Sequence, residues 1–131
     1  MTRLLPVLLA LWPAAAQADT IVPPQVFEQL STGKTLYFFR DGEFFGAEQY
    51  FPNRKSLWQY NGGDCLEGNW FAQGDLVCFT YREDPRVQCW YFLDKSDGYV
   101  ARGEFDPPEL DLELGRIDTE PLNCPAPDFG A

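Results

Sequence analysis

The chain has 131 residues, with 10 basic and 20 acidic side chains, four cysteines and no histidine. This length suits a single domain, and a formal net charge of −10 repels nucleic acid and anionic lipid. The absence of histidine excludes Ser-His and Cys-His nucleophile pairs and proton transfer by imidazole. The composition therefore favours a binding role over histidine-dependent catalysis.

Residues 1–18 are typical of a cleaved export signal. Arg3 supplies a positive start, an apolar stretch interrupted by a proline follows, and small residues of the A-x-A type end at Ala18. The stretch is shorter than the roughly 20 apolar residues that span a bilayer. We expect cleavage before Asp19 and one domain over 19–131, whose charge is −11 once Arg3 is removed. A periplasmic or secreted location without a membrane span follows.

The first expected element of the domain is a short helix. Phe27 and Leu30 lie three residues apart after two prolines, and Gly33 closes the segment. Tight-turn sequences, of which Asp41-Gly42 is the strongest hairpin signal, then separate seven short aromatic-rich strands. The expected strands are 34–39, 43–51, 56–61, 66–72, 76–82, 87–93 and 99–105.

These turns leave no room for crossover helices, so the strands should form an antiparallel meander. Several strands are apolar on both faces, as in the run from Tyr37 to Phe39, which an open sheet with one wet face would not show. We predict a mainly all-β fold, a small barrel of about 7–8 strands with the helix and the C-terminal segment over its outside. A β-sandwich is the alternative.

From about residue 106 the chain becomes acidic, proline-rich and irregular. Alternation of Leu110, Leu112 and Leu114 predicts one further strand, and no regular pattern follows it. Cys124 lies in this segment, where a disulfide would tie an otherwise mobile end to the domain.

The four cysteines allow three pairings. If Glu83-Asp84 is the centre of a four-residue loop, Tyr81 faces Arg86. Counting outward from that pair puts Cys78 opposite Cys89, at a separation that a disulfide can bridge.

The other two cysteines are assigned by elimination. A turn at Gly74-Asp75 puts Cys78 opposite Phe71 and leaves Cys65 about six residues, on the order of 20 Å, further along its strand. We therefore expect Cys65 to pair with Cys124 and Cys78 with Cys89. Gaps of 12, 10 and 34 residues without a histidine do not fit a zinc site.

Several short motifs share their spacing with a known family. They are Gly33-Lys34-Thr35-Leu36, Cys65-x-x-Gly68-x-Trp70, Cys78-Phe79-x-Tyr81, Gln88-Cys89-Trp90 and Cys124-Pro-x-Pro. Over about Phe27 to Gly130 the chain resembles an uncharacterised family of small exported disulfide-containing proteins of Gram-negative bacteria. The resemblance implies that the cysteines act as a set, and it implies no activity or catalytic residue.

Carboxylate pairs are available for acid–base chemistry, Glu43 with Glu48 and Glu83 with Asp84. In a chain with twenty acids such pairs arise by chance, so we interpret them as solvated surface. The acidic residues within 94–98 and 106–113 are likewise interpreted as turn and surface residues rather than a calcium site. We expect no catalytic residue, no metal and no cofactor.

Most aromatic rings should fill the core, and a subset could line a barrel mouth or an exposed patch. The candidates are Tyr37, Trp58, Tyr60, Trp70 and Trp90. We expect a non-catalytic exported binding or interaction protein of the bacterial envelope, whose partner is a basic protein or a small apolar ligand.

Two other functions are the alternatives. One is an acidic inhibitor of a basic exported enzyme such as a lysozyme, acting through the loop at 53–55 or 83–85. The other, ranked last, is an enzyme that uses carboxylates. An enzyme would need a cleft with a strongly shifted carboxylate, whereas a ligand carrier needs an apolar cavity on the order of several hundred Å³.

Overall fold

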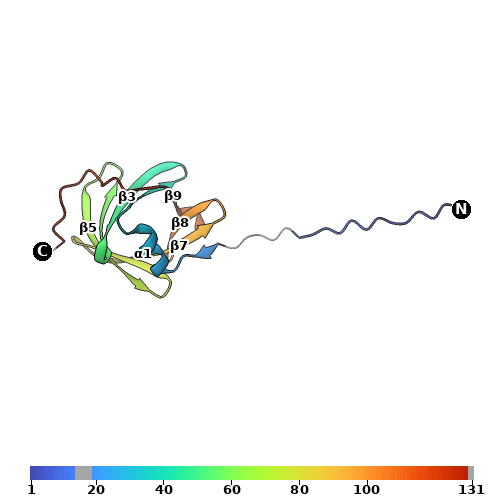
Figure 1. Ribbon diagram of the computed structural model, residues 1–131, viewed down its shortest axis with the longest axis horizontal. Coiled ribbons are helices and arrows are strands. Elements are labelled where there is room, and N and C mark those ends of the chain that lie inside the picture. The colour runs from blue at the N-terminus through green and yellow to red at the C-terminus, as the bar shows by residue number, and fades with distance from the viewer. Residues whose placement is uncertain (14–18, 130–131) are drawn as a thin grey trace.

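The computed structural model describes residues 1–13 and 19–129. The expected cleavage motif ending at Ala18 falls in residues 14–18, which lie outside the described residues, as do 130–131. Residues 1–13 form no helix or strand and run away from the domain (Figure 1). In the described ranges no helix has the length and apolar character needed to cross a membrane.

One short helix and nine strands make up the domain in the described part of the chain. In chain order they are β1 (Thr20–Ile21), α1 (Pro24–Ser31), β2 (Thr35–Arg40), β3 (Glu43–Phe51), β4 (Lys55–Tyr60), β5 (Cys65–Gln73), β6 (Leu76–Tyr81), β7 (Asp84–Lys95), β8 (Gly98–Gly103) and β9 (Leu112–Asp118). Single 3-10 turns at Pro52–Arg54 and Pro108–Leu110 precede β4 and β9.

Strands β2 to β9 form a closed antiparallel barrel. Each pairs with the next along the chain, and β9 also pairs with β2, so the meander closes on itself. The short β1 adds to β7 outside this ring. The predicted barrel is confirmed, and the β-sandwich alternative is wrong. The strand expected from the leucine alternation is β9, which extends to Asp118 and removes the free edge that an open meander would leave.

The β2–β3 hairpin has a turn set by its local sequence and a bulge that shifts the register of the two strands. Asp41 and Gly42 have φ of 50° and 79°, which is the left-handed pair that a two-residue hairpin turn requires. Phe39 pairs with Phe44 while Phe38 pairs with Gly46. Phe45 is therefore an extra residue in β3, as in a β-bulge.

Helix α1 closes one end of the barrel and does not lie over its outside, so that expectation is wrong. Figure 1 shows α1 inside the ring of strands. Phe27, 2% exposed, packs edge-on against Tyr50, Trp70 and Phe92 with ring centroids 5.4, 5.4 and 5.1 Å away. The apolar side of a helix needs an apolar surface, and the open end of an aromatic barrel supplies one.

Both predicted disulfides are present, although one step of the prediction is wrong. Tyr81 pairs with Asp84 rather than with Arg86, because the loop is shorter than four residues. A register shift between Phe79 and Tyr81 then restores the alignment and puts Cys78 opposite Cys89. Their Cα atoms lie 4.0 Å apart.

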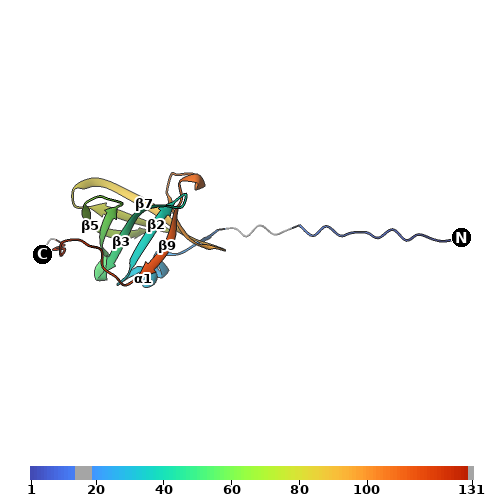
Figure 2. The same ribbon diagram turned by 90° about the horizontal axis from the view of Figure 1, so that it is seen from above.

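The C-terminal segment lies over the outside of the barrel, as predicted. Cys124 is joined to Cys65, the Leu122 amide donates to the Gln49 side chain at 3.0 Å, and the Phe129 ring packs on an aromatic ring of β3 at 5.0 Å. Figure 2 shows this segment running from the end of β9 past β3 and β5. The disulfide thus fixes the irregular C-terminal segment to the outside of the barrel.

Replacing Cys78 and Cys89 together by alanine should lower the free energy of unfolding by about 2–3 kcal/mol, because the crosslink closes a loop between residues 11 positions apart. Urea unfolding of the double variant and of the wild type without reductant measures the loss. Peptide mapping of the unreduced wild type is the companion experiment, and recovery of Cys78 joined to Cys65 or Cys124 would contradict the pairing.

Candidate ligand-binding site

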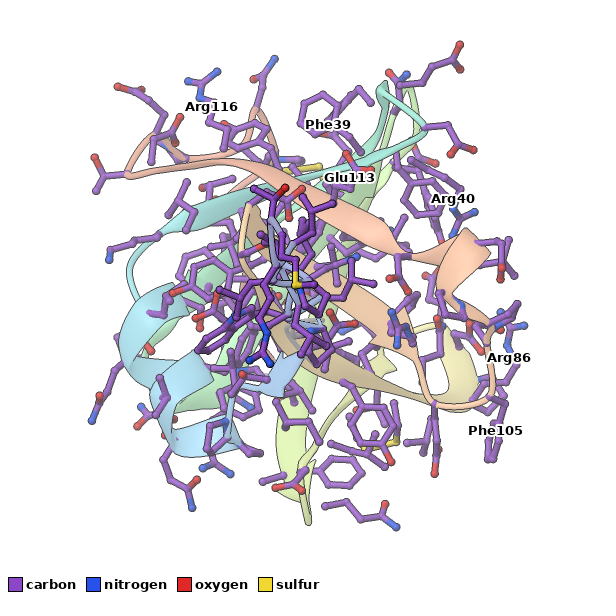
Figure 3. All side chains as sticks on the ribbon, turned by 90° about the vertical axis from the view of Figure 1, so that its right-hand side faces the viewer. Phe39, Arg40, Arg86, Phe105, Glu113 and Arg116 are labelled. Carbon is purple, nitrogen blue, oxygen red and sulfur yellow. A yellow bond between two sulfur atoms is a disulfide. The ribbon has the colours of Figure 1, made fainter. Side chains whose placement is uncertain are left out.

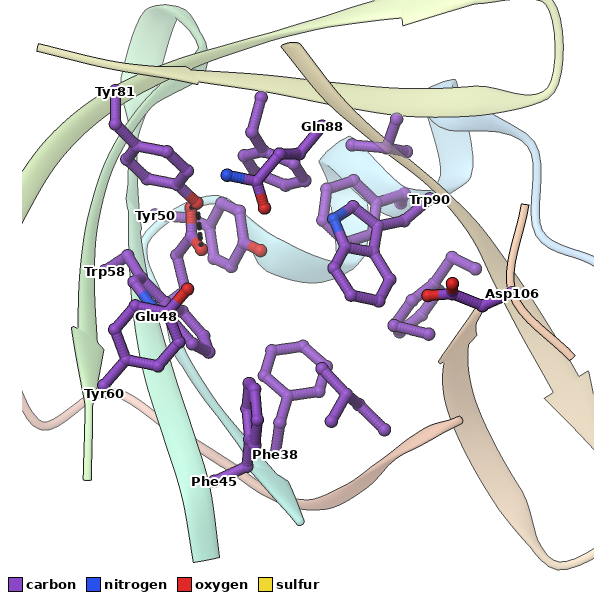
Figure 4. Close-up of a pocket in the computed structure, with 16 residues that line it drawn as sticks. Phe38, Phe45, Glu48, Tyr50, Trp58, Tyr60, Tyr81, Gln88, Trp90 and Asp106 are labelled. Atoms are coloured by element: carbon purple, nitrogen blue, oxygen red, sulfur yellow. Dashed lines mark hydrogen bonds between the residues drawn. The ribbon is translucent and has the colours of Figure 1, made fainter. Parts of the chain in front are cut away.

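The barrel encloses a cavity of about 300 Å³ between α1 and the opposite end. Figure 4 shows the side chains around it. Phe27 forms the floor, while Asp106 and the 46% exposed Tyr60 lie toward solvent. The full lining consists of Phe27, Phe38, Phe45, Glu48, Tyr50, Trp58, Tyr60, Val77, Phe79, Tyr81, Gln88, Trp90, Phe92, Ala101, Asp106 and Leu112.

The lining follows from the two-residue repeat of β-strands, which points alternate side chains into the barrel. Glu48 and Tyr50 face inward from β3, Trp58 and Tyr60 from β4, and every second residue from Val77 to Tyr81 from β6. The bulge in β3 adds Phe45 to the same wall. Most inward positions therefore carry aromatic rings.

Two inward-facing glycines explain why these rings leave space at the centre. A Cβ on Gly46 would lie 2.6 Å from the Trp58 indole, and one on Gly68 would lie 2.8 Å from the Tyr81 ring. Without a side chain at these positions, each ring can lie against the backbone of the neighbouring strand. The rings thus cover the wall and leave the middle of the barrel open.

Glu48 is the chemically distinctive residue of the wall. It is 3% exposed, and the Tyr81 hydroxyl donates to its two carboxyl oxygens at 3.1 and 2.9 Å (Figure 4). Burial raises the pKa of Glu48 to about 7, against the opposing effect of the Ser56 and Tyr81 hydroxyls. Burial, together with the Glu48 charge, raises the pKa of Tyr50 and of Tyr81. Both phenols stay neutral near pH 7, where Glu48 titrates.

Among the described residues, the lining contains two carboxyl groups, those of Glu48 and Asp106, and no lysine or arginine. Two arginines lie toward the open end of the barrel (Figure 3), but neither is in the lining and both side chains contact other groups. Arg40 lies 4.7 Å from the centre of the Phe45 ring and donates to a backbone carbonyl at 3.1 Å. Arg86 forms a two-pronged contact with a surface carboxylate at 2.9 and 2.7 Å. The cavity is therefore acidic.

Three of the five aromatic residues predicted for a binding surface lie together. Trp58, Tyr60 and Trp90 line the cavity. Trp70 is buried beneath α1 and is outside the lining. Tyr37 lies on the outer face, with a guanidinium 4.7 Å from its ring, because its strand position alternates with the inward ones. Trp70 and Tyr37 therefore contribute to packing and do not line the cavity.

The interpretation of Glu48 as solvated surface is wrong. Glu48 lies two residues from the inward-facing Tyr50, and this spacing was the signal available in the sequence. Its proposed partner Glu43 is exposed and lies next to the hairpin turn, so the two carboxylates do not form a pair. Glu83 and Asp84 lie at the surface side of the β6–β7 turn, where the Asp84 pKa is lowered to about 2 by hydrogen bonds from an arginine.

In the first of the two loops considered for an inhibitor, 53–55, both basic side chains bind within the chain. Arg54 donates to Glu28 at 3.1 and 3.3 Å and lies 4.5 Å from the Trp70 ring centre. Lys55 donates to Asn69. An inhibitory loop needs a side chain that projects as an anchor, and these two basic side chains are used to hold the β3–β4 turn.

The geometry can hold a small ligand against aromatic rings and can offer it a carboxyl group that changes charge near neutral pH. In residues 1–13 and 19–129, no group of three or more Asp, Glu, Cys or His side chains is arranged to hold a metal ion. Comparisons of this chain with protein-family models, with curated proteins and with solved structures find no match.

Proposed function

We propose that this is an exported, non-catalytic binding protein of the bacterial envelope that holds a small ligand inside its barrel. The observation that carries the proposal is the hollow interior, a cavity of about 300 Å³ walled by aromatic rings. Ligand pockets are concave, mostly apolar and provided with a few polar groups. This cavity has that composition.

The hollow interior supports binding because side chains alone could have filled it. A barrel of eight strands is narrow enough for side chains to fill completely. Here the glycines at 46 and 68 direct large rings onto the wall. A ligand that fills the space would bury its own apolar surface and that of the surrounding rings.

Export is supported by separate features. The first eighteen residues have the order of a signal peptide, and both disulfides suit an oxidising compartment.

Filling the cavity should abolish binding. We expect Ala101→Phe, which places a ring in the space, to weaken binding of any fragment that the wild type binds by at least about tenfold, since the ring occupies the site. Ligand-observed NMR with a library of small aromatic and aliphatic fragments measures this. Ala72→Phe is the matched control, because Ala72 is exposed and outside the lining.

The outcomes separate clearly. Thermal unfolding curves establish that each variant keeps the barrel. A wild-type protein that binds no fragment, or an Ala101→Phe variant that is folded and binds as tightly as the wild type, would overturn a function based on the cavity.

A carboxylate enzyme is the second candidate, because Glu48 is the shifted carboxyl group in a cleft that such an enzyme would need. Mass spectrometry of the bound fragments after incubation with the wild type and with Glu48→Gln tests it. Recovery of unchanged fragments from both proteins supports binding alone, and conversion by the wild type only would favour the enzyme.

A further inference from the structure

We propose that the ligand is a small organic cation, whose positive group lies beside Glu48 and whose apolar part packs on the aromatic wall. This inference rests on the proposed function, since it specifies the class of ligand for the same cavity. Three features of the lining carry it: a buried carboxyl group without a cationic partner, a cluster of rings next to that group, and a second carboxyl group at the open end.

The carboxyl group of Glu48 has hydrogen bonds but no counter-charge in the lining. The Tyr81 hydroxyl donates to both of its oxygens, and the Ser56 hydroxyl also favours its charged form, but both are neutral groups. Buried charges are normally paired with the opposite charge, because an unpaired buried charge is strongly unfavourable. A cationic ligand would supply the partner that the protein itself does not place there.

The rings beside Glu48 suit a cation rather than a neutral group. Trp58 is the cross-strand neighbour of Glu48, and its ring centroid lies 5.1 Å from that of Tyr60 and 6.1 Å from that of Phe45. Tyr60 and Phe45 lie 5.7 Å apart. Figure 4 shows these three rings on one side of the cavity with Glu48. Aromatic groups attract alkylammonium groups through their electron-rich faces. The Arg40 guanidinium already lies 4.7 Å from the centre of the Phe45 ring, so Trp58 and Tyr60 are the rings that would receive the ligand cation.

The open end of the cavity carries a carboxyl group and lies on a domain of net negative charge. Asp106 lies at the open end of the lining, across the cavity from Glu48 in Figure 4. The chain has a net charge of −10. The Arg40 guanidinium on the Phe45 ring adds one positive charge near this end, so the attraction of a cation comes from the negative field of the whole domain together with Asp106 and Glu48.

The affinity for a cation should depend on pH through Glu48. The groups that face it are Tyr50 from β3, Ser56 and Tyr60 from β4, Tyr81 from β6 and Gln88 from β7. None of these side chains carries a positive charge, and the pKa of Tyr50 and of Tyr81 is raised. Since the empty site holds Glu48 with a pKa of about 7, a permanently charged ligand should bind more tightly as the pH rises through 7.

The test uses phenyltrimethylammonium and its neutral isostere tert-butylbenzene, measured by quenching of tryptophan fluorescence and by titration calorimetry. We expect the cation to bind the wild type at pH 8 at least about tenfold more tightly than the isostere. One cation–π contact or ion pair contributes enough free energy for a difference of this size. Its affinity should fall about tenfold between pH 8 and pH 6, while that of the isostere stays constant.

Glu48→Gln should lose both the preference for the cation and its pH dependence. Glu43→Gln is the matched control in the same strand, since Glu43 is exposed and outside the lining, and it should keep both. The pH series on the wild type does not depend on any variant folding.

Equal affinity for cation and isostere at pH 8, a pH-independent cation affinity, or no binding of the cation would each overturn the inference. The fragment experiment decides the proposed function separately. If neutral fragments bind the wild type and Ala101→Phe abolishes their binding, the proposed ligand-binding function is supported even when the cation proposal fails. If no compound of any kind binds, both proposals fail.

Discussion

Glu48→Gln should make the protein more stable than the wild type at pH 8 and should remove a fall in stability that the wild type shows as the pH rises. Glu48 is buried and its pKa is raised from 4.5 to about 7. Between these values the unfolded chain has released the proton while the native protein retains it. The free energy of unfolding therefore decreases as the pH rises from about 4.5 to about 7 and is constant above that range.

The size of this effect follows from the shift in pKa. Each unit is worth 1.36 kcal/mol, so a change from 4.5 to about 7 corresponds to about 3 kcal/mol. The lowered pKa of Asp84 acts in the opposite sense, with stability lost as the pH falls from its ordinary value of 3.8 toward about 2. Its window therefore lies below that of Glu48.

Urea unfolding of the wild type and of Glu48→Gln at several values between pH 4 and pH 8 measures the effect. The difference between the two proteins should change by about 3 kcal/mol over this range in favour of the variant, and the contributions of other carboxyl groups cancel in that difference. Glu43→Gln should follow the wild type. A constant difference between the wild type and Glu48→Gln would show that the pKa of Glu48 is the same in the native protein as in the unfolded chain, and would contradict the raised value.

Phe27→Ala should lower the free energy of unfolding by about 3–5 kcal/mol, the range for truncating a buried phenylalanine. Phe27 is 2% exposed and makes edge-on contacts with the rings of Tyr50, Trp70 and Phe92. It is also the floor of the cavity, so its loss should extend the cavity toward α1. The barrel end then has no apolar cover beneath the helix.

Urea or thermal unfolding compares this variant with Val26→Ala. Val26 is on the same helix and is 45% exposed, so its truncation should change stability by no more than about 0.5 kcal/mol. A loss below about 1 kcal/mol for Phe27→Ala would mean that α1 does not hold the barrel end closed.

Features that depend on neighbouring residues were predictable. The hairpin at Asp41-Gly42 needs only two residues that accept positive φ, and the chain order of turns leaves a meander as the simplest connection. The pairing of Cys78 with Cys89 was also predictable, although through a wrong loop register. The register shift between Phe79 and Tyr81 could not be derived, because a bulge is an adjustment of two strands to each other.

The candidate site was predictable only in part. Alternation shows that Glu48 shares a face with Tyr50, but the face that becomes interior is decided when β9 pairs with β2 and closes the barrel. Trp58, Tyr60 and Trp90 were recognised as aromatic candidates, and they line the cavity. Tyr37, from an equally aromatic strand, faces outward toward a guanidinium.

The sequence by itself determined the all-β meander and the tight turns, because these depend on local conformational preference and on spacing along the chain. The disulfide pairing followed from spacing for Cys78 and Cys89 and from elimination for Cys65 and Cys124, which lie 59 positions apart. Only the tertiary structure decided that α1 enters the barrel end, that Glu48 is buried, and that the interior is hollow. Burial of a carboxyl group and the space between rings depend on all eight strands at once. Glu48 titrates near 7 because closure of the barrel removes water from around it.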